Sequence, residues 1–319
     1  MLRALLISLS KAEWAKHLVT RWQVAWRVAS RFIAGETLEE ATRVIRVLNE
    51  AGLNATVDHL GEHTTDVVEA QRATEATLVS LEEIERQHLR ANVSVKLSAI
   101  GLTVDPVLCR QNLERIVVRA RELGNFVRVD MEDSSLVDAT LELVHWCHDQ
   151  GYTNVGVAIQ SYLYRSEQDT RHLVSRRVPI RLVKGAYKEP PEIAYPHKRD
   201  VDASFDRLTD ILLQGVQEAG IPQISEDGRF PPIPAIATHD EARIRYAQER
   251  ARHLGLPNTA LEFQMLYGIR RDLQQELVRA GYPVRVYVPY GTHWYPYFMR
   301  RLAERPANLW FFISNFFRR

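Results

Sequence analysis

The chain has 319 residues, of which 45% are hydrophobic and 25% charged, and its formal net charge is +1. This composition is typical of a globular protein with one large core and argues against a disordered chain. The balance of acidic and basic residues also argues against a nucleic-acid-binding protein. With only two cysteines and no CxxC motif, a disulfide framework is not expected, and a reducing, cytoplasmic setting is.

The first segment is apolar but short. Charged residues from Lys11 onward interrupt it, whereas a membrane-spanning helix needs about 20 apolar residues. Helical periodicity follows over 11–33, and Thr37 with Glu40 forms the capping-box pattern of a further helix. We interpret residues 1–53 as packing helices that precede the main part of a single domain.

From residue 54 onward one pattern recurs: an amphipathic helix, a glycine, then a short β-branched run. Left-handed helix ends are expected at Gly52, Gly124, Gly151, Gly220, Gly255 and Gly281. The predicted strands are 54–61, 92–100, 126–132, 154–161, 179–187, 234–240, 261–266 and 284–290. Helices between successive strands indicate a parallel sheet, and eight such units predict an α/β protein with a (β/α)8 TIM-type barrel over 54–310.

The strands alternate between aliphatic and polar residues, as in VRVD at 127–130 and VRVY at 284–287. In a barrel the valines would face the helices, and the arginines, Asp130 and Tyr287 would face the interior. Such charges form either a satisfied ion network or a ligand site. Because barrel sites lie at the carboxyl ends of the strands, we favour a site.

Five segments together resemble the proline dehydrogenase family: VSVKLSAIG at 93–101, VRVDMED at 127–133, RLVKGAY at 181–187, ATHD at 237–240 and YFMRRLAE at 297–304. The most specific is a Tyr-x-x-Arg-Arg-x-x-Glu signature, matched by Tyr297, Arg300, Arg301 and Glu304, on a final helix over the barrel mouth. The resemblance covers about residues 54–310. It implies an FAD enzyme that oxidises L-proline to Δ1-pyrroline-5-carboxylate by hydride transfer from substrate C5 to flavin N5.

The resemblance also implies site residues. Asp130 and Arg181 would be catalytic, and Lys96 would lie near the substrate carboxylate with Asp130 as its counter-charge. The Arg300 and Arg301 forks suit a planar carboxylate, and Tyr287 and Tyr297 would wall the proline ring. Noncovalent FAD would contact Met131, Gln160, Arg181, Lys184, Gly185, Ala186, Thr238 and His239.

One feature conflicts with a regular strand. Arg181 and Lys184 are three residues apart, so an uninterrupted strand would direct them to opposite faces. We therefore expect either a bulge or a strand that ends before Lys184.

The resemblance implies partners as well: membrane quinone as electron acceptor, hence a peripheral contact at the inner face of the membrane, and hand-over of the product to a separate pyrroline-5-carboxylate dehydrogenase, since no second catalytic domain is seen. The C-terminal tail, 311–319, belongs to the aromatic segment LWFFISNFFRR. This segment either contacts the bilayer or covers apolar surface of the barrel itself.

Two other functions are open to the same residues, and a third is not supported. Lys96 or Lys184 could be the Schiff-base nucleophile of an aldolase-like barrel, or the cations could serve a carboxylate-binding barrel without a cofactor. A metal-dependent hydrolase is not supported, because His59 and His63 do not form the usual ligand pair and no metal site is predicted. No GxGxxG follows a strand, which is compatible with flavin bound in a barrel.

Overall fold

The computed structural model describes residues 23–61, 64–219 and 224–304. The helical pattern before residue 23, Gly220 and the aromatic C-terminal segment lie outside the described residues. Among the described residues, no helix is both long and apolar enough to cross a membrane.

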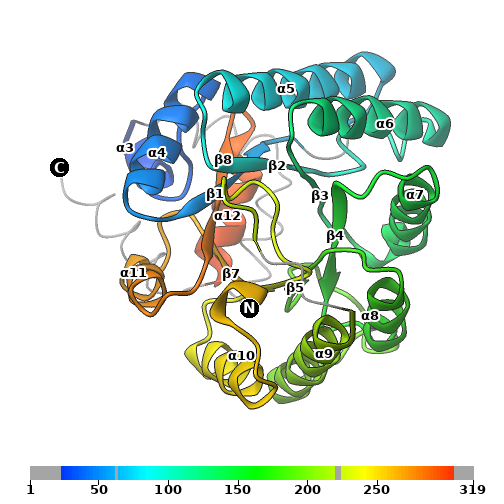
Figure 1. Cartoon of the computed structure of the whole chain (residues 1–319). Coiled ribbons are helices and arrows are strands. Elements are labelled where there is room, and N and C mark those ends of the chain that lie inside the picture. Colours follow the sequence, from blue (N-terminus) through cyan, green and yellow to red (C-terminus); the bar gives the residue numbers. More distant parts are fainter. Residues whose placement is uncertain (1–22, 62–63, 220–223, 305–319) are drawn as a thin grey trace.

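Eight parallel strands close into a barrel in chain order, which confirms the predicted fold (Figure 1). They are β1 (Asn54–His59), β2 (Ala91–Val95), β3 (Val127–Val129), β4 (Val155–Gln160), β5 (Ile180–Val183), β6 (Pro234–Ala237), β7 (Glu262–Leu266) and β8 (Val284–Tyr290). Several strands end earlier than predicted. After β2 the chain turns at once, yet Leu97 and Ile100 in that turn are buried, so their apolar pattern imitates a longer strand.

Helices surround the barrel (Figure 1). They are α3 (Gln23–Ala29), α4 (Leu38–Glu50), α5 (Val67–Arg86), α6 (Pro106–Glu122), α7 (Val137–Asp149), α8 (Ser166–Ser175), α9 (Lys198–Ala219), α10 (Glu241–His253), α11 (Arg271–Arg279) and α12 (Trp294–Glu304), with short 3-10 turns η1 (Ser134–Leu136) and η2 (Asn258–Ala260). The predicted capping box of α4 is present, since Thr37 and Glu40 bond each other's backbone.

The helix ends follow the glycine pattern and extend it. Gly52, Gly124, Gly151, Gly255 and Gly281 all have positive φ, as expected for left-handed caps. After α5 and α8 no glycine is available, and His88 (φ 51°) and Arg177 (φ 58°) take the same conformation. The ends of α5 and α8 therefore could not be predicted from the positions of glycines.

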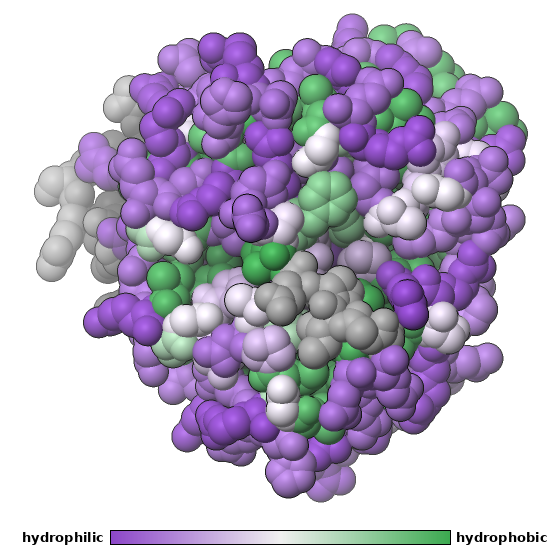
Figure 2. All heavy atoms as spheres, in the orientation of Figure 1, coloured by the Kyte–Doolittle hydropathy of each residue, from purple (hydrophilic) through white to green (hydrophobic). Residues whose placement is uncertain are grey.

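The core lies between strands and helices, as the alternation predicted. Val93, Val127, Val155 and Val286 are each at most 1% exposed and belong to one cluster with the inner faces of the helices. On the face drawn in Figure 2, hydrophilic residues cover most of the outer surface. The polar residues of the opposite parity therefore point into the barrel.

A second apolar cluster positions the last helix. Trp294 and Phe298 of α12 pack with residues of α3, including Val28, and the Trp26 and Trp294 ring centroids are 5.3 Å apart. The Trp294 indole donates to Glu36 at 3.0 Å. The helix is thus fixed by one face, and Tyr297, Arg300 and Arg301 are left to the barrel side.

Candidate functional site

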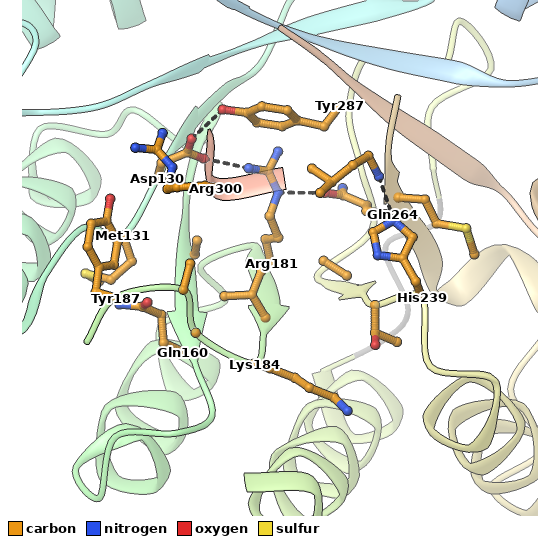
Figure 3. A pocket seen from close by; sticks show the side chains of 18 of the residues that line it. Asp130, Met131, Gln160, Arg181, Lys184, Tyr187, His239, Gln264, Tyr287 and Arg300 are labelled. Carbon is orange, nitrogen blue, oxygen red and sulfur yellow. Dashed lines mark hydrogen bonds and ion pairs between the residues drawn. The ribbon is translucent and has the colours of Figure 1, made fainter. Parts of the chain in front are cut away.

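A cavity of about 390 Å³ lies at the carboxyl ends of the strands, where α12 meets the barrel. Every residue predicted for substrate, catalysis or cofactor lines it, namely Lys96, Asp130, Met131, Gln160, Arg181, Lys184, Gly185, Ala186, Thr238, His239, Tyr287, Tyr297, Arg300 and Arg301. Figure 3 shows many of these side chains pointing toward a common space. Their individual roles stay predictions.

Lys96 stands between two carboxylates. It follows β2 directly, and its ammonium lies 3.1 Å from Asp58 and 3.3 Å from Asp130. The Tyr287 hydroxyl donates to Asp130 at 2.8 Å and accepts from Lys96 at 3.1 Å. The predicted Lys96–Asp130 pair is therefore present, and Asp58 is a second partner that the sequence analysis missed.

Arg181 is fixed at two of its nitrogens. Its Nη1 donates to Asp130 at 2.6 Å, and its Nε donates to Gln264 at 2.6 Å (Figure 3). Ala158 and Ala235 are its register neighbours on the adjacent strands. Their small side chains leave room for a guanidinium inside the barrel.

The two carboxylates respond differently to this environment. Burial raises the pKa of Asp58, and the attraction of Lys96 offsets only part of that effect. Burial also raises the pKa of Asp130, but the positive charges of Lys96 and Arg181 lower it by more. The pKa of Asp130 is therefore below its usual range. Asp130 therefore stays ionised, and Asp58 is the first of the two to take up a proton.

The same residues hold Tyr287 in its neutral form. Burial, followed by the charges of Asp130 and Asp58, raises the pKa of the Tyr287 phenol well above its usual value. Tyr287 is thus a hydrogen-bond donor to Asp130 across the whole neutral range.

The α12 residues form the other side of the cavity. Tyr297 is 6% exposed and Arg301 7%, and the Arg301 guanidinium lies 4.9 Å from the centre of the Tyr297 ring. Arg300 and Arg301 line the same cavity as Lys96, although α12 and β2 are far apart in the chain. The side chain of Glu304, the last residue of the signature, is outside the described part.

Strand β5 ends before Lys184, which is one of the two arrangements expected from the spacing of Arg181 and Lys184. β5 stops at Val183, and Lys184 turns outward to Asp202 at 2.5 Å and Asp240 at 2.7 Å. Gly185 follows with φ +119°, and a Cβ there would lie 2.4 Å from the Tyr162 ring. Only glycine fits this position, so the backbone can come close to the cavity.

His239 and Gln160 are each anchored by backbone. His239 Nε2 accepts from the Leu266 amide at 3.0 Å, which leaves the ring proton on Nδ1 when the imidazole is neutral. Gln160 donates to the Glu132 carbonyl at 2.8 Å. His239 is accordingly a half-buried, hydrogen-bonded histidine that also forms a wall of the cavity.

Deeper in the barrel Arg285 and Glu262 form a satisfied ion pair, so our preference for a site was wrong for this pair. Arg285 and Glu262 are 1% and 0% exposed and form an ion pair at 2.8 Å. Arg128 donates from Nη1 to the backbone carbonyls of Val157 and Pro179, and its buried Nη2 has no hydrogen-bond partner among the described residues. These groups lie toward the amino ends of the strands, away from the cavity.

Among the polar residues at the site that sequence reasoning missed are Asp58, Tyr187 and Gln264. Asp58 is on β1 and 2% exposed, and Gln264 is on β7 and lines the cavity. The signal was present: Asn54, Thr56 and Asp58, like Glu262 and Gln264, repeat polar residues at a spacing of two within strands.

Comparisons with known proteins agree with the segment resemblance. The family model described as proline dehydrogenase matches residues 41–313. Proline dehydrogenase 1 of Bacillus subtilis (strain 168) is 39% identical over 287 residues, 90% of each chain. A proline dehydrogenase of Deinococcus radiodurans is 39% identical over 297 residues, 92% of this chain and 91% of that protein.

A solved structure is similar over the same region. Proline utilization A (PutA) from Bdellovibrio bacteriovorus, inactivated by N-propargylglycine, superposes with a TM-score of 0.79 at 27% identity, over 88% of this chain and 33% of that one. The barrel, the matched signature and these relatives agree, and the chain therefore belongs to the proline dehydrogenase family of oxidoreductases.

Proposed function

We propose that the protein oxidises L-proline to Δ1-pyrroline-5-carboxylate with noncovalently bound FAD. One observation carries the proposal: cations from opposite parts of the chain, Lys96 beside β2 and Arg300 with Arg301 on α12, line one cavity together with Arg181. An amino-acid carboxylate could be held there next to a planar cofactor. The names of the relatives, proline dehydrogenases from two bacteria, support the same substrate.

Substrate binding would begin at the carboxylate. Two guanidinium forks provide more charge-assisted donors than one carboxylate needs, so they would fix both its position and its plane. The Lys96 ammonium, whose donors contact Asp58, Asp130 and Tyr287, would add positive charge. Tyr287 and Tyr297 line the cavity beside these cations. Their ring faces would supply apolar contact for the proline methylenes.

The cavity fits a flavin in chemical character. Ala158, Val183, Ala237 and Leu266 give it apolar walls, and Gly185 has no side chain that could obstruct a ring system. Gln160, Thr238 and His239 add polar groups, so Met131, Gln160, Lys184, Gly185, Ala186, Thr238 and His239 are the residues that we assign to FAD. Bound FAD would supply a hydride acceptor at N5.

Arg181 and Asp130 would act on charge. The fixed Arg181 guanidinium would stabilise the negative charge that bound FAD gains on reduction. Asp130 holds both Arg181 and Lys96 in place and, together with Asp58, balances their charges. Proline reacts through its neutral amine, so a proton must leave. Asp58, through Lys96, would accept it more readily than Asp130 through water, because the pKa of Asp58 is raised and that of Asp130 is lowered.

The electrons would pass to membrane quinone, with the protein in peripheral contact with the membrane. The product would go to a separate pyrroline-5-carboxylate dehydrogenase. The aldolase-like alternative loses support in the structure, because Lys96 and Lys184 each contact two carboxylates. A lysine nucleophile is activated by an apolar or cationic environment instead.

The test is direct. Purified protein reconstituted with FAD should show a flavin spectrum that bleaches when L-proline is added without oxygen, and mass spectrometry should find a product two hydrogens lighter than proline. D-proline is the stereochemical control. Protein that binds no flavin, or flavin that stays oxidised with L-proline, would refute the proposal.

A further inference from the structure

A buried chain of hydrogen bonds connects the cavity to the middle of the barrel. Glu262 and Gln264 have the same parity on β7, so both side chains point inward, one above the other. Gln264 donates from Nε2 to Glu262 at 2.6 Å, and its Oε1 accepts from Arg181 Nε at 2.6 Å. Their exposures are 0% for Glu262 and 5% for Gln264 and Arg181.

Glu262 determines which way the Gln264 amide points. Arg285 donates to both Glu262 oxygens, at 2.8 and 3.0 Å, so this carboxylate is an acceptor only. A flipped Gln264 would place oxygen against the Glu262 oxygen and NH2 against the Arg181 N–H. Both contacts would be repulsive, and both groups are buried, so a flip is costly.

The oriented amide in turn fixes Arg181. Its Nε is held by Gln264, and its Nη1 is held by Asp130 at 2.6 Å and by Ser94 at 3.3 Å. No hydrogen bond runs from Nη2 to another described residue, and Arg181 lines the cavity. The guanidinium is thus clamped at two corners, with the third available to a ligand.

We propose that Glu262 and Gln264 are positioning residues that fix the Arg181 guanidinium against the flavin, Glu262 acting only through Gln264. This inference rests on the function proposed above. A guanidinium that is held only by Asp130 could pivot about that contact, and a displacement of about 1 Å at a reacting centre can cost up to about a hundredfold in rate. The Arg285–Glu262 ion pair would then influence the site without contacting a ligand.

The test uses Gln264→Met, which keeps the volume of the side chain and removes the acceptor. Anaerobic stopped-flow should show flavin reduction by L-proline slowed by about tenfold or more. The flavin midpoint potential should fall, because a looser cation stabilises the reduced ring less. The concentration of proline at half-saturation should stay near the parental value, since Gln264 is not among the residues that we assign to the substrate.

The matched control is Gln274→Met. Gln274 is also a buried glutamine, 2% exposed, but its Nε2 donates to backbone carbonyls, those of Ile269 at 2.9 Å and Leu266 at 3.4 Å. We expect it to lower the melting temperature without moving the flavin potential. A Gln264→Met variant that behaves like this control, with parental potential and reduction rate, would overturn the proposal.

Glu262→Gln tests the indirect step. In a positioning chain this change slows reduction, whereas the double variant with Gln264→Met is no slower than Gln264→Met alone. Additive losses would show that Glu262 acts independently of Gln264. Should Glu262→Gln not fold, the comparison of Gln264→Met with Gln274→Met still tests whether Gln264 positions Arg181.

A second readout separates this inference from the proposed function. With selectively 15N-labelled arginine, the Arg181 Nε–H should exchange slowly in the parental protein and at least about tenfold faster in Gln264→Met, with or without flavin reduction. If proline fails to reduce the flavin but this difference is found, only the proposed function fails. Equal exchange rates would refute the positioning role itself.

Discussion

The two halves of the barrel interior contain the same kinds of residue and do different things. In the lower half, Arg285 is paired with Glu262 and Arg128 with backbone carbonyls. In the upper half, Lys96 and Arg181 are paired with Asp58 and Asp130, but they also border a cavity. Protein groups satisfy the buried Arg285–Glu262 pair, whereas the upper charges border a space that a ligand can enter. Charge inside a barrel thus marks a site only where a cavity accompanies it.

The largest effect should come from breaking the lower half. Arg285→Leu leaves the Glu262 carboxylate buried without its ion partner, which should reduce the free energy of unfolding by ~3–5 kcal/mol. Urea denaturation measures it. The exposed Arg171–Glu167 pair is the control, and Arg171→Ala should change the midpoint little. Comparable losses in both variants would mean that burial does not distinguish these pairs.

Breaking the upper half should affect catalysis more than stability. Asp130→Asn removes the carboxylate that joins Lys96, Arg181 and Tyr287. We expect kcat for proline oxidation to fall by about a hundredfold, with a smaller loss of unfolding free energy than in Arg285→Leu, because the cavity lets solvent reach the remaining charges. Steady-state kinetics and urea melts on the same preparations provide the comparison. A loss of stability equal to that of Arg285→Leu would contradict it.

Gly185→Ala tests the cavity wall. The added Cβ meets the Tyr162 ring at 2.4 Å and the backbone has positive φ, so the loop must shift. FAD affinity should weaken by about tenfold, assuming a strain of ~1–2 kcal/mol. Isothermal titration measures this. Gly61→Ala, where nothing lies within 4 Å, is the matched control and should bind FAD like the parent.

The smallest effect concerns pH. The folded-state pKa of Asp58 is raised, so the folded protein takes up a proton there at a higher pH than the unfolded chain. As pH falls, Asp58 is neutralised before Asp130, and Lys96 then has one carboxylate partner. We expect a few-fold fall of kcat/KM on the acid limb that Asp58→Asn abolishes. An unchanged acid limb in Asp58→Asn would assign the titration to another group.

Most of the fold could be predicted from the sequence, because β-branched alternation and helix-ending glycines act locally. Strand ends could not, since buried apolar residues such as Leu97 continue into the following turn. The cavity residues were predicted from the sequence segments that resemble the family, and not from the alternation of residues along the strands. The alternation of residues along a strand shows that Arg128 and Arg181 both face the interior, but not which of them reaches the cavity. The position of a residue along the barrel axis depends on the stagger between strands, which forms only when the barrel closes.

The central claim is that Lys96 and the α12 arginines bind one carboxylate beside the flavin, and the ratio of flavin reduction rates with L-proline and L-prolinamide tests it most directly. Prolinamide keeps the ring and amine but lacks the negative charge. The ratio should be about a hundred or more in the parental enzyme, and it should collapse toward one in Lys96→Met and Arg300→Met as proline loses its advantage. Equal rates for both compounds in the parental enzyme would show that these cations do not bind the substrate carboxylate.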